Sequence, residues 1–572
     1  MKTFDELRRL AKRPSPEFRR VRLAVLADSA AQLYALALRG EAADRRLSLA
    51  VLEGEFDQID QAILDPSSEL RRSRPEFVVV WRSAERLLSA FRALPSTERA
   101  SFADRHVAHV RRLADALAES TSARILHVNV PEIDDGVFGS FANKIPSSWV
   151  HQLRRINVLL MELASSRDDF FLLDLALLFA EHGRAAAEDR RLAVTARMAL
   201  GVDFLPVFAE RTLDVVDAIL GRARKCLVLD LDNTLWGGIA AEDGLPGIEL
   251  GELGLGPAFT EIQCWAKELE RRGVVLAVSS KNEERVAREV FDRHPDMVLR
   301  LEDIAVFCAG WESKVDHLRH IQSVIGIGFD GMVFLDDSAV ERAAVRAALP
   351  EVCVPELPAD PVEVMPFLRR LNLFEAASFT GEDARRTAYY REESQRRALQ
   401  GPSGAPEDFL RGLEMTAKVE GFTPFNLPRV AQLTQRSNQF NLRTVRHAEG
   451  DLRRISGSAG HLPFAFSLED RFGAYGLVSV VILEAQGEAM FVDTWLMSCR
   501  VLKRGLENFV LDVLVEAARG RGARGIIGEH LPTPKNALVR DHYATLGFER
   551  RGDLWYLDLE TYRPREHFIR RA

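Results

Sequence analysis

CLVLDLDNTLWGG (residues 226–238) places two carboxylates directly after a short apolar run. Its first four residues are typical of a buried strand, and Asp230 and Asp232 follow where that strand would end. Residues two apart in an extended chain point to the same side. Ligands of open α/β sheets gather at the carboxyl ends of the strands. The stretch therefore predicts a binding or catalytic site at the end of a parallel strand.

Two more apolar runs end in polar residues, and a lysine opens a helix nearby. VVLAVSS (274–280) ends in hydroxyls, MVFLDD (332–337) ends in acids, and a helix follows GWES. Four acids at one sheet edge would raise one another's pKa, and a hard divalent cation with oxygen ligands would relieve this repulsion. We therefore expect a Mg²⁺ site there. The side chains offered are Ser279, Ser280, Lys314, Asp336 and Asp337.

Strand and helix patterns divide the 572-residue chain into an α/β multidomain protein. Residues 1–220 and 221–375 alternate apolar strands with helices, which predicts two parallel sheets. In the second of these, we expect one strand at 297–300. Residues 376–406 read as a helical connector ending in the linker GPSGAP, and 407–572 as a separate α+β domain.

Composition excludes several classes of protein. The formal net charge is −8, which argues against a general nucleic-acid or membrane-surface binder. The N-terminus has no apolar signal region, and no run is long enough to span a membrane. The five cysteines are scattered singly, as expected in a reducing compartment and without zinc-site spacing. We expect a cytoplasmic protein.

DLDNT (230–234) resembles the first motif of the haloacid dehalogenase (HAD) superfamily. Ser280, Lys314 and the Asp336–Asp337 pair match the second, third and fourth motifs in order. The resemblance implies that Asp230 is the nucleophile and that Asp232 is the general acid/base. Ser280 and Lys314 would hold the phosphoryl oxygens, although Ser279 remains open as the alternative serine. The implied metal ligands are Asp230, Asp232 (through its carbonyl), Asp336 and the supporting Asp337.

Trp236, Gly237 and Gly238 follow the first motif. Two interpretations are open for them. They could form a flap beside the site, or they could be an ordinary turn with a packed tryptophan.

Longer stretches resemble the FkbH-like family. These are KCLVLDLDNTLWGG, VSSKNEERV, GWESK, FLDDSAVER, EGEFDQIDQAILDPSSEL, TQRSNQFNLRT and MSCRVLKRGLE. The resemblance implies an SGNH-hydrolase-like domain, a HAD domain and a GNAT (acetyltransferase)-like domain, in that order. It also implies an enzyme of polyketide biosynthesis that dephosphorylates 1,3-bisphosphoglycerate and passes the glyceryl unit to an acyl carrier protein. The glyceryl thioester would serve methoxymalonyl extender units or tetronates.

Two other functions remain open at this point. One is a HAD-type small-molecule phosphatase that involves no carrier protein. The other is a non-catalytic module that binds a carrier protein for another enzyme. Intact HAD motifs argue against the second.

Cys499 is the candidate for a covalent glyceryl intermediate. Arg500 is adjacent, and Lys503 and Arg504 are near. Basic neighbours lower a thiol pKa and favour the thiolate. The alternative is a small buried packing residue.

Residues 26–34, LADSAAQLY, occupy the place of the GDS motif of SGNH hydrolases, with Ala27 in the place of glycine. The late DxxH motif of that family is missing, so Ser29 lacks the histidine that a serine hydrolase needs. We expect Ser29 to be a turn or helix N-cap residue. The domain would then not be a hydrolase and would dock a carrier protein or form one wall of the cleft.

The last domain resembles GNAT proteins in its phosphate loop. Lys503 replaces a loop glycine, and a Cβ there can block close approach to phosphate, while the added charge can compensate, so the loop is weakened for coenzyme A. We expect the phosphopantetheine arm of a carrier protein as the ligand instead. The loop residues are Arg500, Lys503, Arg504 and Gly505, and Asn536 and Tyr543 would face the arm. Asn438, Gln439, Asn441 and Arg443 would line a channel or form a helix end and turn.

Overall fold

The computed structural model describes all residues except 1, 14–16, 380–405, 499–500, 503 and 534. The chain divides into two compact units, Met1–Asp217 and Ala218–Ala572. Most of the predicted connector lies outside the described residues, and so do Cys499, Arg500 and Lys503. The expected boundaries at 220, 375 and 406 remain predictions.

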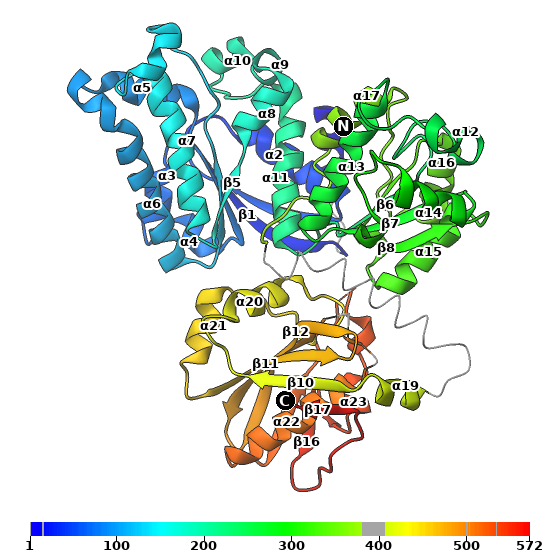
Figure 1. The fold of residues 1–572 in the computed structure, drawn as a ribbon. Helices are drawn as coiled ribbons and strands as arrows, with labels where there is room; N and C mark the ends of the chain where they lie inside the picture. The colour runs from blue at the N-terminus through cyan, green and yellow to red at the C-terminus, as the bar shows by residue number, and fades with distance from the viewer. Residues whose placement is uncertain (1, 14–16, 380–405, 499–500, 503, 534) are drawn as a thin grey trace. The chain divides into compact units, whose positions relative to one another are not determined.

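The first unit is a five-stranded parallel sheet in the order β2-β1-β3-β4-β5 (Figure 1). Its strands β1 to β5 are Arg19–Ala27, Leu47–Glu53, Phe77–Trp81, Arg124–Val128 and Phe170–Leu173. Strand β3 is buried along its whole length, as expected for a parallel strand covered on both faces.

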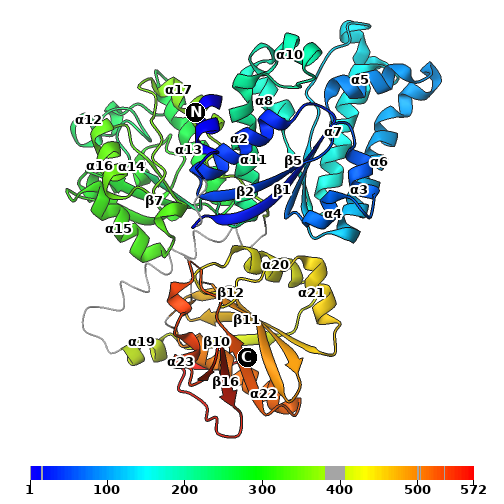
Figure 2. The ribbon, with the colours of Figure 1, turned by 180° about the vertical axis from the view of Figure 1, so that it is seen from behind.

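Helices cover both faces of this sheet. The helices α1 to α11 are Phe4–Leu10, Gln32–Asp44, Ile59–Leu64, Glu69–Ser73, Ala84–Ala93, Phe102–Ser120, Trp149–Ser165, Leu175–His182, Arg184–Ala187, Arg190–Thr195 and Leu205–Ile219. Helix α2 lies beside β1 and β2 (Figure 2). There Tyr34 stacks on Phe208 of α11, and both rings contact Trp81 of β3. Helices α6 and α7 contribute to the core on the other face.

The second sheet carries the opening motif. Its four parallel strands have the order β8-β7-β6-β9, with β6 at Cys226–Leu229, β7 at Val275–Ser280, β8 at Ile304–Ala309 and β9 at Met332–Leu335. Helices α12 to α17 are Ala240–Gly247, Gly256–Arg271, Glu284–Arg293, Lys314–Ile325, Ala339–Ala348 and Pro361–Arg370. All four strands run in parallel, so their carboxyl ends meet at one edge of the sheet.

The prediction of a strand at 297–300 is wrong. The strand in this part of the chain is β8, which begins only at Ile304. Met297 and Leu299 are buried in the core, which explains the apolar pattern. However, the backbone N–H groups of Val298 and Leu299 donate to the side-chain oxygen of Gln263, at 2.9 and 3.2 Å. A buried glutamine therefore replaces the neighbouring strand as their hydrogen-bond partner.

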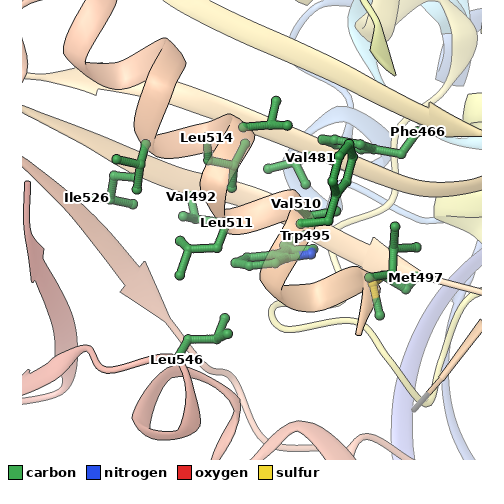
Figure 3. Packing of buried hydrophobic residues seen from close by; sticks show 14 of the residues in the cluster. Phe466, Val481, Val492, Trp495, Met497, Val510, Leu511, Leu514, Ile526 and Leu546 are labelled. Carbon is green, nitrogen blue, oxygen red and sulfur yellow. The ribbon is translucent and has the colours of Figure 1, made fainter. Parts of the chain in front are cut away.

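The third sheet is mixed, in the order β15-β16-β14-β13-β12-β11-β10-β17. Its strands β10 to β17 are Met415–Glu420, His461–Asp470, Gly473–Gln486, Ala489–Met497, Gly525–Glu529, Glu549–Arg551, Leu554–Asp558 and Ile569–Arg571. The helices α19 to α23 are Pro406–Gly412, Leu427–Arg436, Glu449–Ser456, Leu506–Gly520 and His542–Thr545. Figure 3 shows Trp495 and Val492 of β13 packed with Val510, Leu511 and Leu514 of α22.

Two parallel sheets and one mixed sheet confirm the expected α/β multidomain class. Every helix in the described part of the chain is too short or too polar to cross a lipid bilayer.

Candidate active site at the carboxyl edge of the second sheet

Lys314 joins two buried carboxylates at the ends of neighbouring strands. Its ammonium nitrogen lies 2.7 Å from Oδ1 of Asp230 and 2.9 Å from Oδ2 of Asp336. Asp230 follows β6, and its backbone N–H donates to the carbonyl of Leu335 on β9 at 2.9 Å. This backbone bond fixes Asp230 beside the end of β9. The sequence-predicted residues Asp230, Lys314 and Asp336 are thus brought together.

Lys314 is placed by the first turn of α15. Ser313 caps this helix by accepting the backbone N–H of Asp316 at 3.1 Å. The Lys314 ammonium also donates to the backbone carbonyl of Ser279 at 2.8 Å. Three oxygens therefore lie within 2.9 Å of the ammonium nitrogen.

Burial dominates the titration of Asp230 and raises its pKa to about 7. Lys314 lowers the pKa of Asp230, and the charge of Asp336 raises it again. For Lys314 itself, burial lowers the pKa, but Asp230 and Asp336 raise it above the usual lysine value. The site therefore holds one ammonium against two carboxylates and favours a further cation.

Three carboxylates fit a hard divalent cation here. Asp230, Asp336 and Asp337 each offer an oxygen, and these oxygens lie within 4.8 Å of one another. Asp230 and Asp336 are buried, whereas Asp337 is exposed and leaves one side of the group open. Among the described residues, no other group of three ligand-type side chains comes this close together. An all-oxygen donor set of this kind suits Mg²⁺.

Arg342 stabilises the backbone directly after β9, where Asp336 and Asp337 lie. Its guanidinium donates to the backbone carbonyls of Asp336 and Asp337, at 2.8 and 2.7 Å, and pairs with Glu356 at 2.5 Å. The backbone N–H of Ser338 donates to Oδ1 of Asp336 at 2.9 Å. Arg342 was not predicted from the sequence; its only signal was an arginine in the helix that follows LDD.

Asp232 lies beside the three-acid group and outside it. Its Oδ1 accepts the indole N–H of Trp236 at 2.9 Å and the backbone N–H of Ala240 at 3.1 Å. Its Oδ2 accepts the side-chain N–H of Asn282 at 2.8 Å. Three donors thus hold both oxygens of Asp232. Sequence reasoning missed Asn282, although it stands two residues after the predicted Ser280.

Trp236 and Gly237 form a packed turn. Trp236 is fully buried, with its ring edge-on to Phe291. Gly237 exchanges two backbone hydrogen bonds with Glu249, at 3.0 and 2.8 Å, and a Cβ on Gly237 would lie only 2.8 Å from the Phe259 ring. These contacts favour the turn with a packed tryptophan over a flap.

The two serines of β7 differ in surroundings. The Ser279 hydroxyl lies 3.2 Å from Nδ1 of His317, and both side chains are buried. The Ser280 hydroxyl lies 3.5 Å from the Asn282 amide that holds Asp232. Ser280 is therefore the serine on the side of the general acid/base candidate.

Three more of the predicted site residues, Asn536, Tyr543 and Arg504, are buried. Asn536 is fully buried and donates to the carbonyls of Asn441 and Leu531. Tyr543 is buried beside Gly528, where a Cβ would lie 2.3 Å from the Tyr543 ring. Arg504 is buried over the ring of Phe409, and Gly505, with φ +75°, stands at the N-cap of α22.

Ser29, in the first unit, is buried at the end of β1. Its hydroxyl has no hydrogen-bond partner among the described residues. The N-cap of α2 is Ala31, so Ser29 occupies the bend before the helix and does not cap it. Neighbouring Asp28 accepts the backbone N–H of Ser83 at 2.8 Å.

Comparison with known families and structures covers most of the chain. Residues 22–217 match the FkbH N-terminal domain. The N-terminal part of the protein BF1531 from Bacteroides fragilis, described as containing a phosphatase domain complexed with Mg, is 42% identical. The match covers 66% of this chain and 100% of that one, with a TM-score of 0.64.

The C-terminal part matches solved acetyltransferases only weakly. The ribosomal-protein-S18-alanine N-acetyltransferase from Escherichia coli is 14% identical over 27% of this chain and 99% of that chain, with a TM-score of 0.21. The GNAT domain of S. lividans PAT is 16% identical over 24% and 89%, with a TM-score of 0.20. Similarity this low supports no argument about function. No curated protein matches the chain.

Proposed function

The chain belongs to the FkbH family and carries a HAD-type phosphatase domain, and from this premise we propose a Mg²⁺-dependent phosphatase and glyceryl transferase. Its substrates would be 1,3-bisphosphoglycerate and the thiol of an acyl carrier protein. The single observation that supports the phosphatase half best is the placement of Lys314 between Asp230 and Asp336.

Asp230 is the proposed nucleophile. One carboxylate oxygen forms a bond to phosphorus while the bond from phosphorus to the leaving oxygen breaks. Asp232 donates a proton to the leaving oxygen and then accepts one from the water that releases phosphate from Asp230. Lys314 and the Ser280 hydroxyl hold the phosphoryl oxygens.

Asp230, Asp336 and Asp337 are the proposed metal ligands, together with the backbone carbonyl of Asp232. Bound Mg²⁺ supplies positive charge that neutralises phosphoryl oxygens. The chain's own contribution is positional: Arg342 fixes the backbone of Asp336 and Asp337, and Asn282 and Trp236 fix Asp232.

Glyceryl transfer needs a second step with a thiol. The sulfur attacks the acyl carbon of the acyl phosphate, a carbon–sulfur bond forms, and the carbon–oxygen bond to phosphate breaks. The thiol proton leaves to solvent, so the full reaction consumes one water and releases two phosphates. Cys499 is proposed to carry the glyceryl group before the carrier does. The residues proposed for the phosphopantetheine arm are those of the loop, Arg500, Lys503, Arg504 and Gly505. Asn536 and Tyr543, which the sequence also offered, are buried, and Asn536 is bonded to the backbone of Asn441 and Leu531.

Support for the two halves differs. The phosphatase half rests on the three acids, Lys314 and the Mg-bound relative. The carrier half rests on family membership alone. A phosphatase that uses no carrier is therefore the second candidate.

One incubation separates these candidates. The protein, Mg²⁺, 1,3-bisphosphoglycerate and a holo carrier protein are mixed, and the carrier is weighed by intact mass spectrometry. We expect a glyceryl adduct on the carrier. Phosphate release without any adduct would support the phosphatase that uses no carrier. If neither phosphate nor adduct is formed, the non-catalytic binding module is supported instead.

A further inference from the structure

Strands β13 and β14 of the mixed sheet separate soon after they begin. They pair in parallel at three residue pairs, from Ala489↔Gly525 to Phe491↔Ile527. Strand β13 continues to Met497 and stays paired with β12 on its other side. Beyond Phe491, this edge of β13 would present unpaired backbone groups. Such an edge binds extended molecules that carry amides, and the pantetheine of coenzyme A is one.

The chain fills this opening with its own backbone. The Leu442 N–H donates to the carbonyl of Trp495 at 3.1 Å, and the Met497 N–H donates to the carbonyl of Phe440 at 3.0 Å. On the opposite side, the Leu531 N–H donates to the carbonyl of Leu442 at 2.9 Å. Residues 440–442 therefore lie as a short strand between β13 and the chain that follows β14. We call them the inserted strand.

Side chains anchor the inserted strand in the core. Leu442 is fully buried, and the buried ring of Phe440 lies edge-on to His542 at 4.9 Å between centroids. The Asn536 amide donates to the carbonyl of Asn441 at 3.0 Å and to that of Leu531 at 2.9 Å. One buried side chain thus joins the inserted strand to the segment beyond β14.

Arg443 joins the two separating strands directly after the inserted strand. Its Nε donates to Glu529 of β14 at 2.6 Å, and another nitrogen pairs with Asp493 of β13 at 2.8 Å. The guanidinium lies over the ring of Phe491, the last β13 residue paired with β14. The point of separation is therefore held by ion pairs to both strands.

From these contacts we infer that the inserted strand is a fixed part of the sheet and that the C-terminal domain does not hold coenzyme A between β13 and β14. Coenzyme A, which the GNAT resemblance implies, does not fit here because the backbone groups that would bind it are already paired. The domain is then no acyl-coenzyme A transferase. The inference does not depend on the proposed phosphatase reaction. It applies equally to the phosphopantetheine arm of a carrier protein, which has the same pantetheine and so does not lie between β13 and β14 either.

Amide hydrogen exchange on the full-length protein tests this inference. The amides of Leu442, Met497 and Leu531 should exchange slowly, because each donates a backbone hydrogen bond to or from the inserted strand. Saturating coenzyme A or acetyl-coenzyme A should change neither their exchange nor the melting temperature. If either molecule binds and exchange at Leu442 and Leu531 becomes faster, the inserted strand has moved out of its place beside β13. That result would overturn the inference.

A variant supplies a positive arm of the same test. Asn536→Ala removes both side-chain bonds, so exchange at Leu442 and Leu531 should accelerate, while Asn508→Ala on helix α22, a half-exposed control, should leave it unchanged. Unchanged exchange in Asn536→Ala would contradict the anchoring described above. If Asn536→Ala does not fold, the coenzyme A arm on the unaltered protein decides the question.

Discussion

At the scale of single residues, Lys314 is the cation that the structure places between Asp230 and Asp336. Each of the three residues follows a strand or begins a helix at the carboxyl edge of the sheet. Their places next to apolar runs in the sequence were therefore enough to predict them. Asn282 and Arg342 were not predicted. Each acts on a backbone or carboxylate group that becomes its neighbour only after folding.

Lys314→Met should leave two buried carboxylates without a cation. We expect a loss of stability of roughly 3–5 kcal/mol in the absence of metal, as for other broken buried pairs. Added Mg²⁺ should restore part of the loss, and phosphatase activity should disappear. Urea unfolding with and without Mg²⁺ measures this, with the exposed Lys418→Met as the control. Equal stability of the variant and the unaltered protein would contradict the role given to Lys314.

Asn282→Ala should impair the proposed acid/base without disturbing substrate binding. Asp232 would lose the donor on its Oδ2 while keeping Trp236 and Ala240 on Oδ1. Loss of such a supporting hydrogen bond typically costs about 10–100-fold. We expect this fall in kcat with KM nearly unchanged, in steady-state phosphate release. A rise in KM with kcat intact would instead assign Asn282 to substrate binding.

At the scale of elements, apolar pattern predicted most strands near the site but misplaced one. Met297 and Leu299 are buried as in a strand with one covered face, yet the N–H groups of Val298 and Leu299 donate to Gln263, thirty or more residues earlier. A single polar side chain at that distance leaves no periodic signal. Strand β8 at Ile304–Ala309 takes the edge position instead.

Gln263→Leu should therefore destabilise the second unit. The change leaves the N–H groups of Val298 and Leu299 and the Leu235 carbonyl without their partners. A buried group that loses its partner costs about 1–3 kcal/mol. Denaturant unfolding measures the effect against Gln322→Leu on α15, which is only half-buried. Equal midpoints for the two variants would contradict this account of the segment.

Two buried histidines should make the first unit sensitive to acid. Burial, with a smaller contribution from Arg82, lowers the pKa of His127 on β4 to about 4. Burial, followed by His127 and Arg82, lowers the pKa of His106 on α6 to about 3. The unfolded chain titrates near pH 6.5, so it binds more protons than the folded one below that pH.

The free energy of unfolding that the two neutral histidines contribute is fully present above about pH 6.5. It is lost as the pH falls toward their pKa values in the folded protein, by up to about 1.4 kcal/mol per pH unit for each histidine. His127→Gln should flatten the fall between pH 6.5 and 5, whereas substitution of the exposed His320 should not. The measurement is the pH dependence of the unfolding transition of the first unit. An unaltered slope in His127→Gln would contradict it.

At the scale of the whole molecule, sequence resemblance and structure agree on the class of protein. The family match lies in the first unit, and the Mg-bound relative extends across the second sheet. The mixed sheet was expected from the strand pattern, but its inserted strand was not. SNQFNLRT offered polar side chains for a channel or for a helix end and turn. In the structure, Asn441 is buried and the backbone of residues 440–442 is hydrogen-bonded to both neighbouring segments. Polar residue type alone does not distinguish these uses.

Phosphate release by Asp230→Asn tests the central claim most directly. The measurement uses Mg²⁺ and 1,3-bisphosphoglycerate, with rates corrected for spontaneous hydrolysis and with the exposed Asp292→Asn on α14 as the matched control. If Asp230 attacks phosphorus, its variant should lose at least about 10³-fold in rate, while the control keeps the activity of the unaltered protein. An unchanged rate in Asp230→Asn would contradict the assignment of this site as the phosphatase centre.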